Sequence, residues 1–474
     1  MEKRTNRVIM SLKGSFAGDN DMITRKCEKV IEEHFKSENN KALLITGARQ
    51  VGKTFTVREF GKQNFEYFVE INCLENTSAR ELLSNVTDTK DLLLRLSVVA
   101  DKPLVPGNTL IFIDEIQECK EIVTAVKFLV EEASFKYILS GSLLGVDLKD
   151  IRSVPVGYMD ILEMYPLDFE EFLLANMVSV NIIDSLRESF VGYRPVDEFI
   201  HEKMTDFYRL YLITGGMPAV VMKYLTSNNI KEVIAEQRSI ITLYKKDIAK
   251  YDPDNKLYLE EIFDLIPSEL NSKNKRFILK DLNENLKFSR YSNSFLWLKN
   301  AGVALPCFSV TEPKYPLLLT KKGSLFKLFM SDVGLLASMY MNNIQIRILK
   351  REKEINFGSV YENAVAQELK AHGFDLYYFN SKKQGEVDFL IEYHGEILPV
   401  EIKSGKNHSK HAALNNLLRI KDYGINKAFV FHNGNVSIHD NIYYLPVYFI
   451  MFLRSSRNEF AEDMIYKIDT AGLN

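Results

Sequence analysis

The sequence predicts an α/β protein with several domains in one chain. Short apolar runs alternate with helical patterns up to about residue 165, and the pattern is helical from about 166 to 250. Short helices followed by hairpin-like strands are indicated from about 255 to 345, and a second α/β pattern begins after about 357. Alternating strands and helices are typical of a parallel sheet covered on both faces. The length of 474 residues is enough for roughly three domains of about 150 residues.

Composition and charge exclude several classes of protein. Hydrophobic residues make up 46% and charged residues 26% of the chain, which is ordinary for globular proteins and excludes a mostly disordered chain. The formal net charge of -3 gives no global basic excess, so any nucleic-acid surface must be a local patch.

The location of the protein is predicted from its cysteines and apolar segments. The four cysteines lie far apart without a CxxC pair, so we expect neither a disulfide framework nor a zinc knuckle, and we expect a reducing, cytoplasmic compartment. The N-terminus has no apolar signal segment, and the apolar stretch 442–453 is too short to span a bilayer. We therefore expect no membrane association.

The elements are predicted in chain order. An amphipathic helix over 22–37 leads into strands at 41–46, 67–72, 109–114 and 136–140, with a helix over 121–132 before the last of them. Helices follow at 169–174, 196–212 and 230–244, with a turn signal at 214–218. A helix at 294–300 and strands at 303–309 and 316–320 then follow the element order of a winged helix.

The last third of the chain predicts a second α/β unit. It contains a helix over 360–372 and strands at 376–379, 387–393, 397–402, 428–431 and 443–449. We place a linker near 341–357. The domains expected are a core over 1–165, a helical lid over 166–250, a winged-helix-like segment over 251–345 and an α/β domain over 346–474.

A phosphate-binding loop is predicted between the strand at 41–46 and the next helical stretch. The segment matches GxxxxGK[ST], in which glycines let backbone amides converge on one point at a helix N-terminus. We expect Lys53 to reach the β- and γ-phosphates of ATP and the Thr54 hydroxyl to ligate Mg²⁺. The alternative is a glycine-rich turn that matches by chance. The loop comprises Gly47, Ala48, Arg49, Gln50, Val51, Gly52, Lys53 and Thr54.

Acidic and hydroxyl side chains that follow two later strands complete this site. A buried strand ends in Asp114, an expected Mg²⁺ ligand, and Glu115 follows as the expected general base for an attacking water. Ser140 and Ser142 end the next strand and are candidates to sense the γ-phosphate or hold the water. The alternatives are two solvated acids and an ordinary strand-to-turn cap.

A second acidic constellation lies in the last third of the chain. Asp388 and Glu401 fall on strands separated by a turn near Gly395, and Lys403 lies on the same face as Glu401 because strand side chains alternate. With Glu362 on the preceding helix, they predict an Mg²⁺ site for phosphodiester cleavage. The alternative is three acids on ordinary solvated faces.

With this phosphate loop, the Asp114-Glu115 pair and the acidic constellation, the chain resembles AAA-type P-loop ATPases of bacteria and archaea. Those proteins carry a C-terminal region with a restriction-endonuclease-like PD-(D/E)xK fold. The resemblance implies an ATPase core, a helical lid, a winged-helix-like segment and a nuclease-like domain, with binding and hydrolysis of ATP. The matching segments are Gly47–Thr54, Ile111–Glu115, Leu139–Ser142, Met164–Leu167, Phe169–Leu173, Tyr211–Pro218, Asp332–Leu336, Tyr361–Leu369, Gly385–Phe389 and Glu401–Lys403.

Two functions are compatible with the sequence. The first is an Mg²⁺-dependent ATPase that couples hydrolysis to a DNA- or RNA-handling module with a nuclease-like domain. The second is an ATP-driven switch that acts on protein partners, with the nuclease-like fold as a silent scaffold. Self-association is compatible with both. DNA affinity that falls steeply with salt distinguishes the first from the second.

Overall fold

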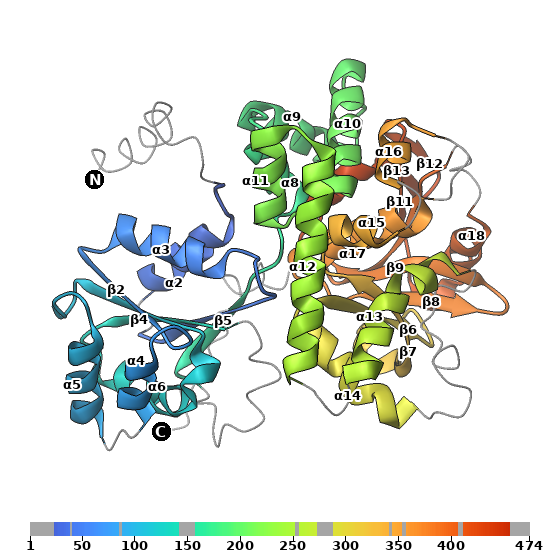
Figure 1. Cartoon of the computed structure of the whole chain (residues 1–474). Helices are drawn as coiled ribbons and strands as arrows, with labels where there is room; N and C mark the ends of the chain where they lie inside the picture. Colours follow the sequence, from blue (N-terminus) through green and yellow to red (C-terminus); the bar gives the residue numbers. More distant parts are fainter. Residues whose placement is uncertain are drawn as a thin grey trace, which may run out of the picture.

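The computed structural model describes residues 23–37, 40–84, 88–141, 157–251, 256–272, 288–340, 344–352, 357–405 and 411–455. The chain forms an N-terminal lobe and a larger lobe that contains all later elements (Figure 1). Ser142 lies outside the described residues. Among the helices of these ranges, none has the length and hydropathy that crossing a bilayer requires.

The N-terminal lobe is built on a five-stranded parallel sheet in the order β2-β3-β4-β1-β5. The four strands predicted here are present, and β5 was not predicted because its side chains are mostly partly exposed and its apolar pattern is weak. The strands are β1 (Ala42–Thr46), β2 (Tyr67–Asn72), β3 (Thr109–Asp114), β4 (Lys136–Ser140) and β5 (Met159–Glu163).

Helices cover both faces of this sheet, as the alternation of elements predicts. Leu43 and Ile45 of β1 belong to one hydrophobic core, whereas Ala42 and Leu44 belong to another, because neighbouring strand side chains point to opposite faces. The first core includes α2 (Cys27–Lys36) and α3 (Lys53–Asn64). The second includes α4 (Thr77–Ser84), α5 (Thr89–Val99) and α6 (Lys120–Glu132).

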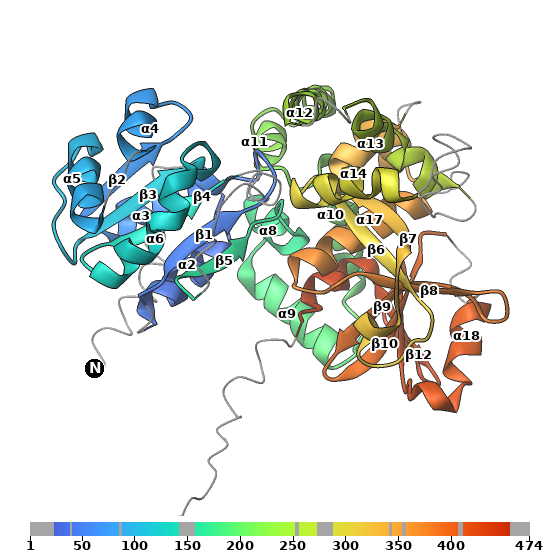
Figure 2. The same cartoon turned by 90° about the horizontal axis from the view of Figure 1, so that it is seen from below.

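A helical region follows the N-terminal sheet, in agreement with the sequence pattern. In Figure 2, α8 and α11 face the side of the sheet that holds β1 and β5. Sequence periodicity found α8 and the long helices α10 and α12 but missed α9 and α11, and where short helices were expected from about residue 255 it gave no bounds for α13. The helices are α8 (Phe169–Ala175), α9 (Val180–Val191), α10 (Glu198–Thr214), α11 (Pro218–Ser227), α12 (Ile230–Tyr251) and α13 (Lys256–Asn271).

The larger lobe contains an eight-stranded mixed sheet in the order β12-β13-β11-β10-β9-β8-β6-β7. Strands β9 and β10 form the predicted antiparallel pair, with the turn at His394 and Gly395. The strands are β6 (Ala304–Val310), β7 (Lys321–Met330), β8 (Tyr377–Ser381), β9 (Gly385–Tyr393), β10 (Glu396–Lys403), β11 (Ala428–His432), β12 (Ser437–His439) and β13 (Ile442–Pro446).

The β6–β7 hairpin belongs to this same sheet. Strand β6 pairs with β7 on one side and runs parallel to β8 on the other. The segment expected as a separate winged helix therefore shares its sheet with the C-terminal strands, because a two-stranded hairpin buries little apolar surface alone. The strand expected at 316–320 is instead the 3-10 helix Leu317–Thr320, which precedes the longer strand β7.

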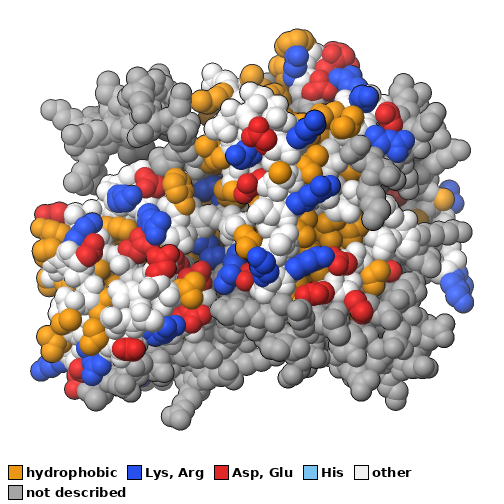
Figure 3. Space-filling view, viewed as in Figure 1, with side chains coloured by type: hydrophobic (Ala, Val, Ile, Leu, Met, Phe, Trp, Pro, Cys, Tyr) orange, Lys and Arg blue, Asp and Glu red, His pale blue; other side chains and the backbone are white. Residues whose placement is uncertain are grey.

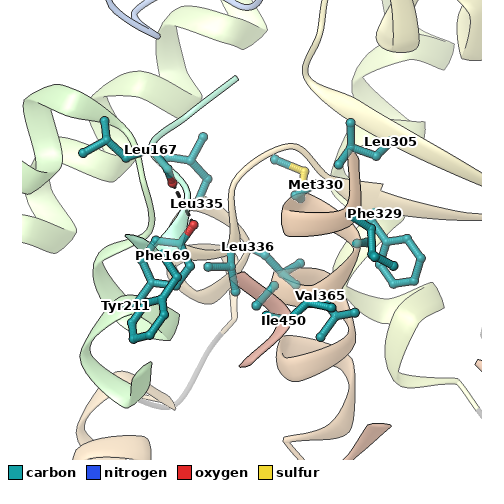
Figure 4. Close-up of a cluster of buried hydrophobic side chains, with 14 of the residues drawn as sticks. Leu167, Phe169, Tyr211, Leu305, Phe329, Met330, Leu335, Leu336, Val365 and Ile450 are labelled. Carbon is teal, nitrogen blue, oxygen red and sulfur yellow. Dashed lines mark hydrogen bonds between the residues drawn. The ribbon is translucent and has the colours of Figure 1, made fainter. Parts of the chain in front are cut away.

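Helix α17 (Gly358–Ala371) is the centre of the larger lobe. Its residues 359 to 369 are all buried. Figure 4 shows its Val365 in a cluster with Phe169, Tyr211 and Leu336, which come from three other helices. The other helices of this part are α14 (Phe288–Asn300), α15 (Val333–Met339), α16 (Ile344–Leu349) and α18 (Ala412–Leu418).

The 3-10 helix η6 (Val447–Phe452) packs against the helical region rather than extending the sheet. All six of its residues are buried. Phe190 of α9 has its ring centroid 5.7 Å from the rings of both Phe449 and Phe452, and the Tyr448 hydroxyl is 2.9 Å from Nδ1 of His201 in α10. The helical region and the C-terminal sheet thus share one core. The strand expected at 443–449 ends at Pro446 instead.

Candidate nucleotide site and acidic centre

The phosphate loop joins β1 to α3 at the carboxyl edge of the N-terminal sheet. Gly47 has a φ of 136°, and a Cβ atom here would collide with the carbonyl group of Met164, so the turn requires glycine. Gly52 then caps the N-terminus of α3. Unpaired amides and the helix dipole at such an N-terminus favour a bound anion.

Lys53, the first residue of α3, folds back over the loop. Its Nζ donates hydrogen bonds of 2.9 Å to the carbonyl oxygens of Gly47 and Ala48. Burial lowers the pKa of Lys53 to about 8, although the Glu115 and Asp114 carboxylates act in the opposite direction. A charged phosphate oxygen is a better partner for this ammonium than a carbonyl oxygen, so the site suits an incoming phosphate.

Asp114 lies at the end of β3 among neutral hydrogen-bond donors. Its Oδ2 accepts a bond of 2.8 Å from the Thr54 hydroxyl, and its Oδ1 accepts one from the Ser140 hydroxyl. Strand β4, which ends in Ser140, lies between β1 and β3. The sheet order therefore brings these three predicted residues together.

This donor set fits a magnesium ion. Hydroxyl and carboxylate oxygens are the hard ligands that Mg²⁺ prefers, and the Thr54 and Asp114 oxygens are already within hydrogen-bond distance. A cation bound between them would replace the hydrogen bond from the Thr54 hydroxyl to Asp114, and it would not have to break an ion pair of Asp114.

Glu115 follows Asp114 in a left-handed backbone conformation, with a φ of 52°. Its backbone N–H donates to Asp114 Oδ1 over 3.0 Å, and its carboxylate accepts a bond from the Gln117 amide. The same carboxylate acts on the pKa of Lys53, so it lies in the electrostatic range of the phosphate-binding amine. Gln117 was not singled out from the sequence.

Arg25 holds the phosphate loop from outside the motif and was not predicted. Its Nη1 donates to the Val51 carbonyl over 2.8 Å, its Nη2 to the Tyr165 carbonyl over 2.8 Å, and its Nε to Glu171 Oε1 over 3.2 Å. The residue is only 7% exposed. No sequence signal marks it, because it stands alone before a helix and meets the loop only in the fold.

Three further contacts tie the loop to the larger lobe. Arg49 of the loop pairs with Asp247 of α12, with 2.6 Å between Nη1 and Oδ1, and its carbonyl accepts a bond from Tyr244. A Cβ atom at Gly302, after α14, would lie 2.9 Å from the Ala48 nitrogen. A cavity of about 460 Å³ between the lobes reaches Gly47, so their interface is only partly filled.

The residues of the predicted acidic centre lie close together in the larger lobe. Glu362, Asp388 and Glu401 are all buried, and Lys403 Nζ is 2.6 Å from Glu401 Oε1. Burial, together with the nearby Asp388 and Glu362 carboxylates, raises the pKa of Glu401 to about 8, although Lys403 acts in the opposite direction. Asp388 Oδ2 accepts the Ile402 N–H over 2.9 Å.

A second lysine, which the sequence did not indicate, enters this centre from β7. Lys327 is 0% exposed, and its Nζ lies 2.8 Å from Glu386 Oε1 and 4.0 Å from Glu362 Oε2. Although burial opposes the charged form, the surrounding carboxylates raise the pKa of Lys327 above its ordinary value.

A third charged cluster joins α8 to the end of α17. Asp168, which caps α8 in a capping box with Glu171, lies 3.2 Å from His372 Nε2 and 2.5 Å from Lys26 Nζ. Glu368 Oε1 accepts the Phe169 N–H over 2.7 Å. Asp168, Glu368 and His372 could converge on a metal ion, but Lys26 already supplies the cation.

Family comparisons agree with the geometry of the nucleotide site. Residues 39–173 match the model of an AAA domain. Residues 205–346 and 357–450 match two domains of unknown function, DUF8612 and DUF4143. The N-terminal region is therefore an AAA-type P-loop ATPase domain. The nuclease-like character of the C-terminal region stays a prediction.

Solved structures with some similarity include a Walker-type ATPase of Pyrococcus abyssi. Its TM-score is 0.42 at 14% identity, covering 67% of this chain and 96% of that chain. Cdc6p from Pyrobaculum aerophilum has a TM-score of 0.27 at 12% identity, and the match covers 72% of this chain and 97% of that chain. A katanin structure that was described for its self-assembly has a TM-score of 0.25 at 15% identity, and the match covers 46% of this chain and 75% of that chain. Among curated proteins there is no match.

Proposed function

We propose that this protein is an Mg²⁺-dependent ATPase that transmits the nucleotide state of its phosphate loop to the C-terminal α/β region. The observation that carries the proposal is the convergence of Lys53, Thr54, Asp114 and Ser140 at one edge of the sheet. The four free cysteines are compatible with the cytoplasmic location that we also propose.

Each residue has a separate task in this site. The loop amides and Lys53 bind the phosphates of ATP. Thr54 and Asp114 would hold Mg²⁺, which neutralises phosphate charge when bound. Glu115 takes a proton from the attacking water, and Ser140 positions the γ-phosphate or that water.

Arg25 is the proposed link from the loop to the C-terminal region. It bonds to the Val51 carbonyl at one end and to Glu171 at the other. Glu171 shares a capping box with Asp168, which contacts His372 directly after α17. A shift of the loop on ATP binding therefore changes the contacts of α17, since this chain of bonds is buried and continuous.

Hydrogen exchange tests this link. Glu115→Gln is expected to bind ATP without hydrolysing it, and we expect bound ATP to change amide exchange in α17 by at least about three-fold. Adding Arg25→Ala should remove this change. The control is Arg187→Ala, because Arg187 pairs with Glu170 in the same cluster, whereas the bond to the Val51 carbonyl of the loop comes from Arg25.

The outcomes separate two failures. If Glu115→Gln does not bind ATP, the ATPase proposal itself is refuted. If it binds ATP while exchange in α17 stays constant, the nucleotide site stands and the transmission to α17 is refuted.

Nucleic-acid handling is the second candidate, and one feature of α12 favours it. Lys231, Arg238 and Lys245 recur every seven residues along this helix, so they lie on one face. Figure 3 shows Lys and Arg side chains over the central part of the molecule, where α12 runs. Lys245 also pairs with Asp264.

A salt titration decides between DNA or RNA and a protein partner. Phosphate contacts predict that affinity falls about ten-fold or more between 50 and 200 mM salt for even a few contacts. Arg238→Ala should then weaken binding at each salt concentration. Absence of DNA and RNA binding at low salt would leave protein partners, or a second copy of the chain, as the targets of the switch.

A further inference from the structure

The acidic centre of the C-terminal region contains more charge than the sequence motif suggested. Glu386 of β9 joins Glu362, Asp388 and Glu401, so four carboxyl groups lie around one point of the sheet. The PD-(D/E)xK resemblance implies a divalent metal there. Whether the residues fit a metal depends on which oxygens are still available.

Three of these carboxyl groups already have an oxygen in a strong interaction. Lys327 Nζ is 2.8 Å from Glu386 Oε1, Lys403 Nζ is 2.6 Å from Glu401 Oε1, and the Ile402 N–H is 2.9 Å from Asp388 Oδ2. These three oxygens become ligands only if a metal ion displaces an ammonium group or a backbone amide.

The ligand atoms also do not converge. Within the described ranges, the set of acidic, histidine or cysteine ligand atoms lying within 4.8 Å of one another is Asp168, Glu368 and His372, and not the acids of this centre. The carboxylates here surround the lysine side chain instead.

Lys327 is built into this position by the fold. It lies on the edge strand β7 opposite Cys307 of β6, has no exposed surface, and its Nζ is 4.9 Å from the centre of the Tyr378 ring. An ammonium group fixed in a site of low dielectric repels a second cation strongly. Lys327 therefore opposes the binding of a divalent ion at this centre.

We propose that Lys327 occupies the place of the divalent cation, so that the charge of the acidic centre is balanced in part from within and the centre binds no metal. The residues do not fit the metal that the resemblance implies. Metal-activated water is then absent from this centre, and metal-dependent cleavage of a phosphodiester is not one of its activities. This inference is independent of the ATPase proposal.

Manganese binding by the full-length chain tests the proposal, with Mn²⁺ counted by electron paramagnetic resonance in the absence of nucleotide. Wild type and Asp388→Asn should bind the same number of Mn²⁺ ions. Lys327→Met, which keeps the side-chain length without the charge, should bind one Mn²⁺ ion more than wild type. The double variant Lys327→Met with Asp388→Asn should lose this ion again.

Opposite results would overturn the proposal. One is an Mn²⁺ ion in wild type that Asp388→Asn removes. Another is a folded Lys327→Met variant that binds no additional Mn²⁺. If Lys327→Met folds only when Mn²⁺ is present, the proposal is supported, and if it does not fold at all, the comparison of wild type with Asp388→Asn decides alone.

Discussion

The nucleotide site and the acidic centre both place a buried lysine near carboxyl groups, but they pair them differently. Lys53 is bonded to two loop carbonyls, and Asp114 is bonded to hydroxyls. Lys327 and its carboxylates are instead bonded to one another. An anion and a cation can enter the first site by replacing weak partners, whereas in the second site the place of a cation is already taken by the Lys327 ammonium group. Residue types alone do not distinguish these two cases.

The largest expected effect is at the lysine of the nucleotide site. Lys53→Ala should reduce ATP affinity by roughly 100-fold or more, because charged hydrogen bonds contribute about 1.5–3 kcal/mol each. Fluorescent nucleotide titration measures this. Unchanged affinity would mean that Lys53 does not bind the phosphates of ATP. The contrast between an open nucleotide site and an internally paired acidic centre would then be wrong.

The next effect separates binding from chemistry in the same site. Glu115→Gln should keep ATP affinity while turnover falls by about 10²–10⁴-fold, the range for removal of a general base. Steady-state phosphate release and nucleotide titration provide the two readouts. Hydrolysis at the wild-type rate would remove Glu115 from its assigned task.

Stability should reveal the internal pairing of the acidic centre. Lys327→Met should lower the free energy of unfolding by about 3–5 kcal/mol, because it leaves buried carboxyl groups without their cation. Lys403→Met is the matched control. Its side chain is 24% exposed, so a loss of about 1 kcal/mol is expected. Equal losses in denaturant titrations would contradict the central position of Lys327.

The smallest effect concerns pH and the cluster at the end of α17. Burial and the Asp168 carboxylate raise the pKa of Glu368 to about 8. The folded chain thus keeps a proton that the unfolded chain releases above about pH 4.5, so this contribution to stability is complete below that pH and is lost as pH rises towards 8. Glu368→Gln keeps an oxygen acceptor for Phe169.

The variant should therefore gain in melting temperature relative to wild type between about pH 5 and pH 8. The comparison must be made between the two proteins, since His372 works in the opposite direction. Burial lowers the pKa of His372 to about 4, so its contribution is lost as pH falls. Parallel melting profiles of variant and wild type would exclude Glu368 as the titrating group.

Local patterns were sufficient to predict much of the nucleotide site. The bounds of β2, β3 and β4 agree with the prediction, because each is an apolar run between polar turns. Lys53, Thr54 and Asp114 come together because the ends of parallel strands meet at one edge of the sheet. Arg25 and Lys327 could not be found, since each acts on residues far away in the sequence.

The separation into domains was also beyond the local pattern. Hairpin residues such as Phe308 look the same in a separate wing and in a larger sheet. Only the pairing of β6 with β8 shows that they share a sheet with the C-terminal strands. The restriction-endonuclease-like assignment of that region also rests on local residue patterns, and it remains a prediction.

The packing of η6 has a consequence for biosynthesis. Phe449 and Phe452 complete the core around Phe190 of α9, yet they are made more than half a chain later. Domains usually fold as they leave the ribosome. Here the helices that follow the nucleotide domain must wait for synthesis of residue 452, and until then their apolar faces are a natural target for chaperones.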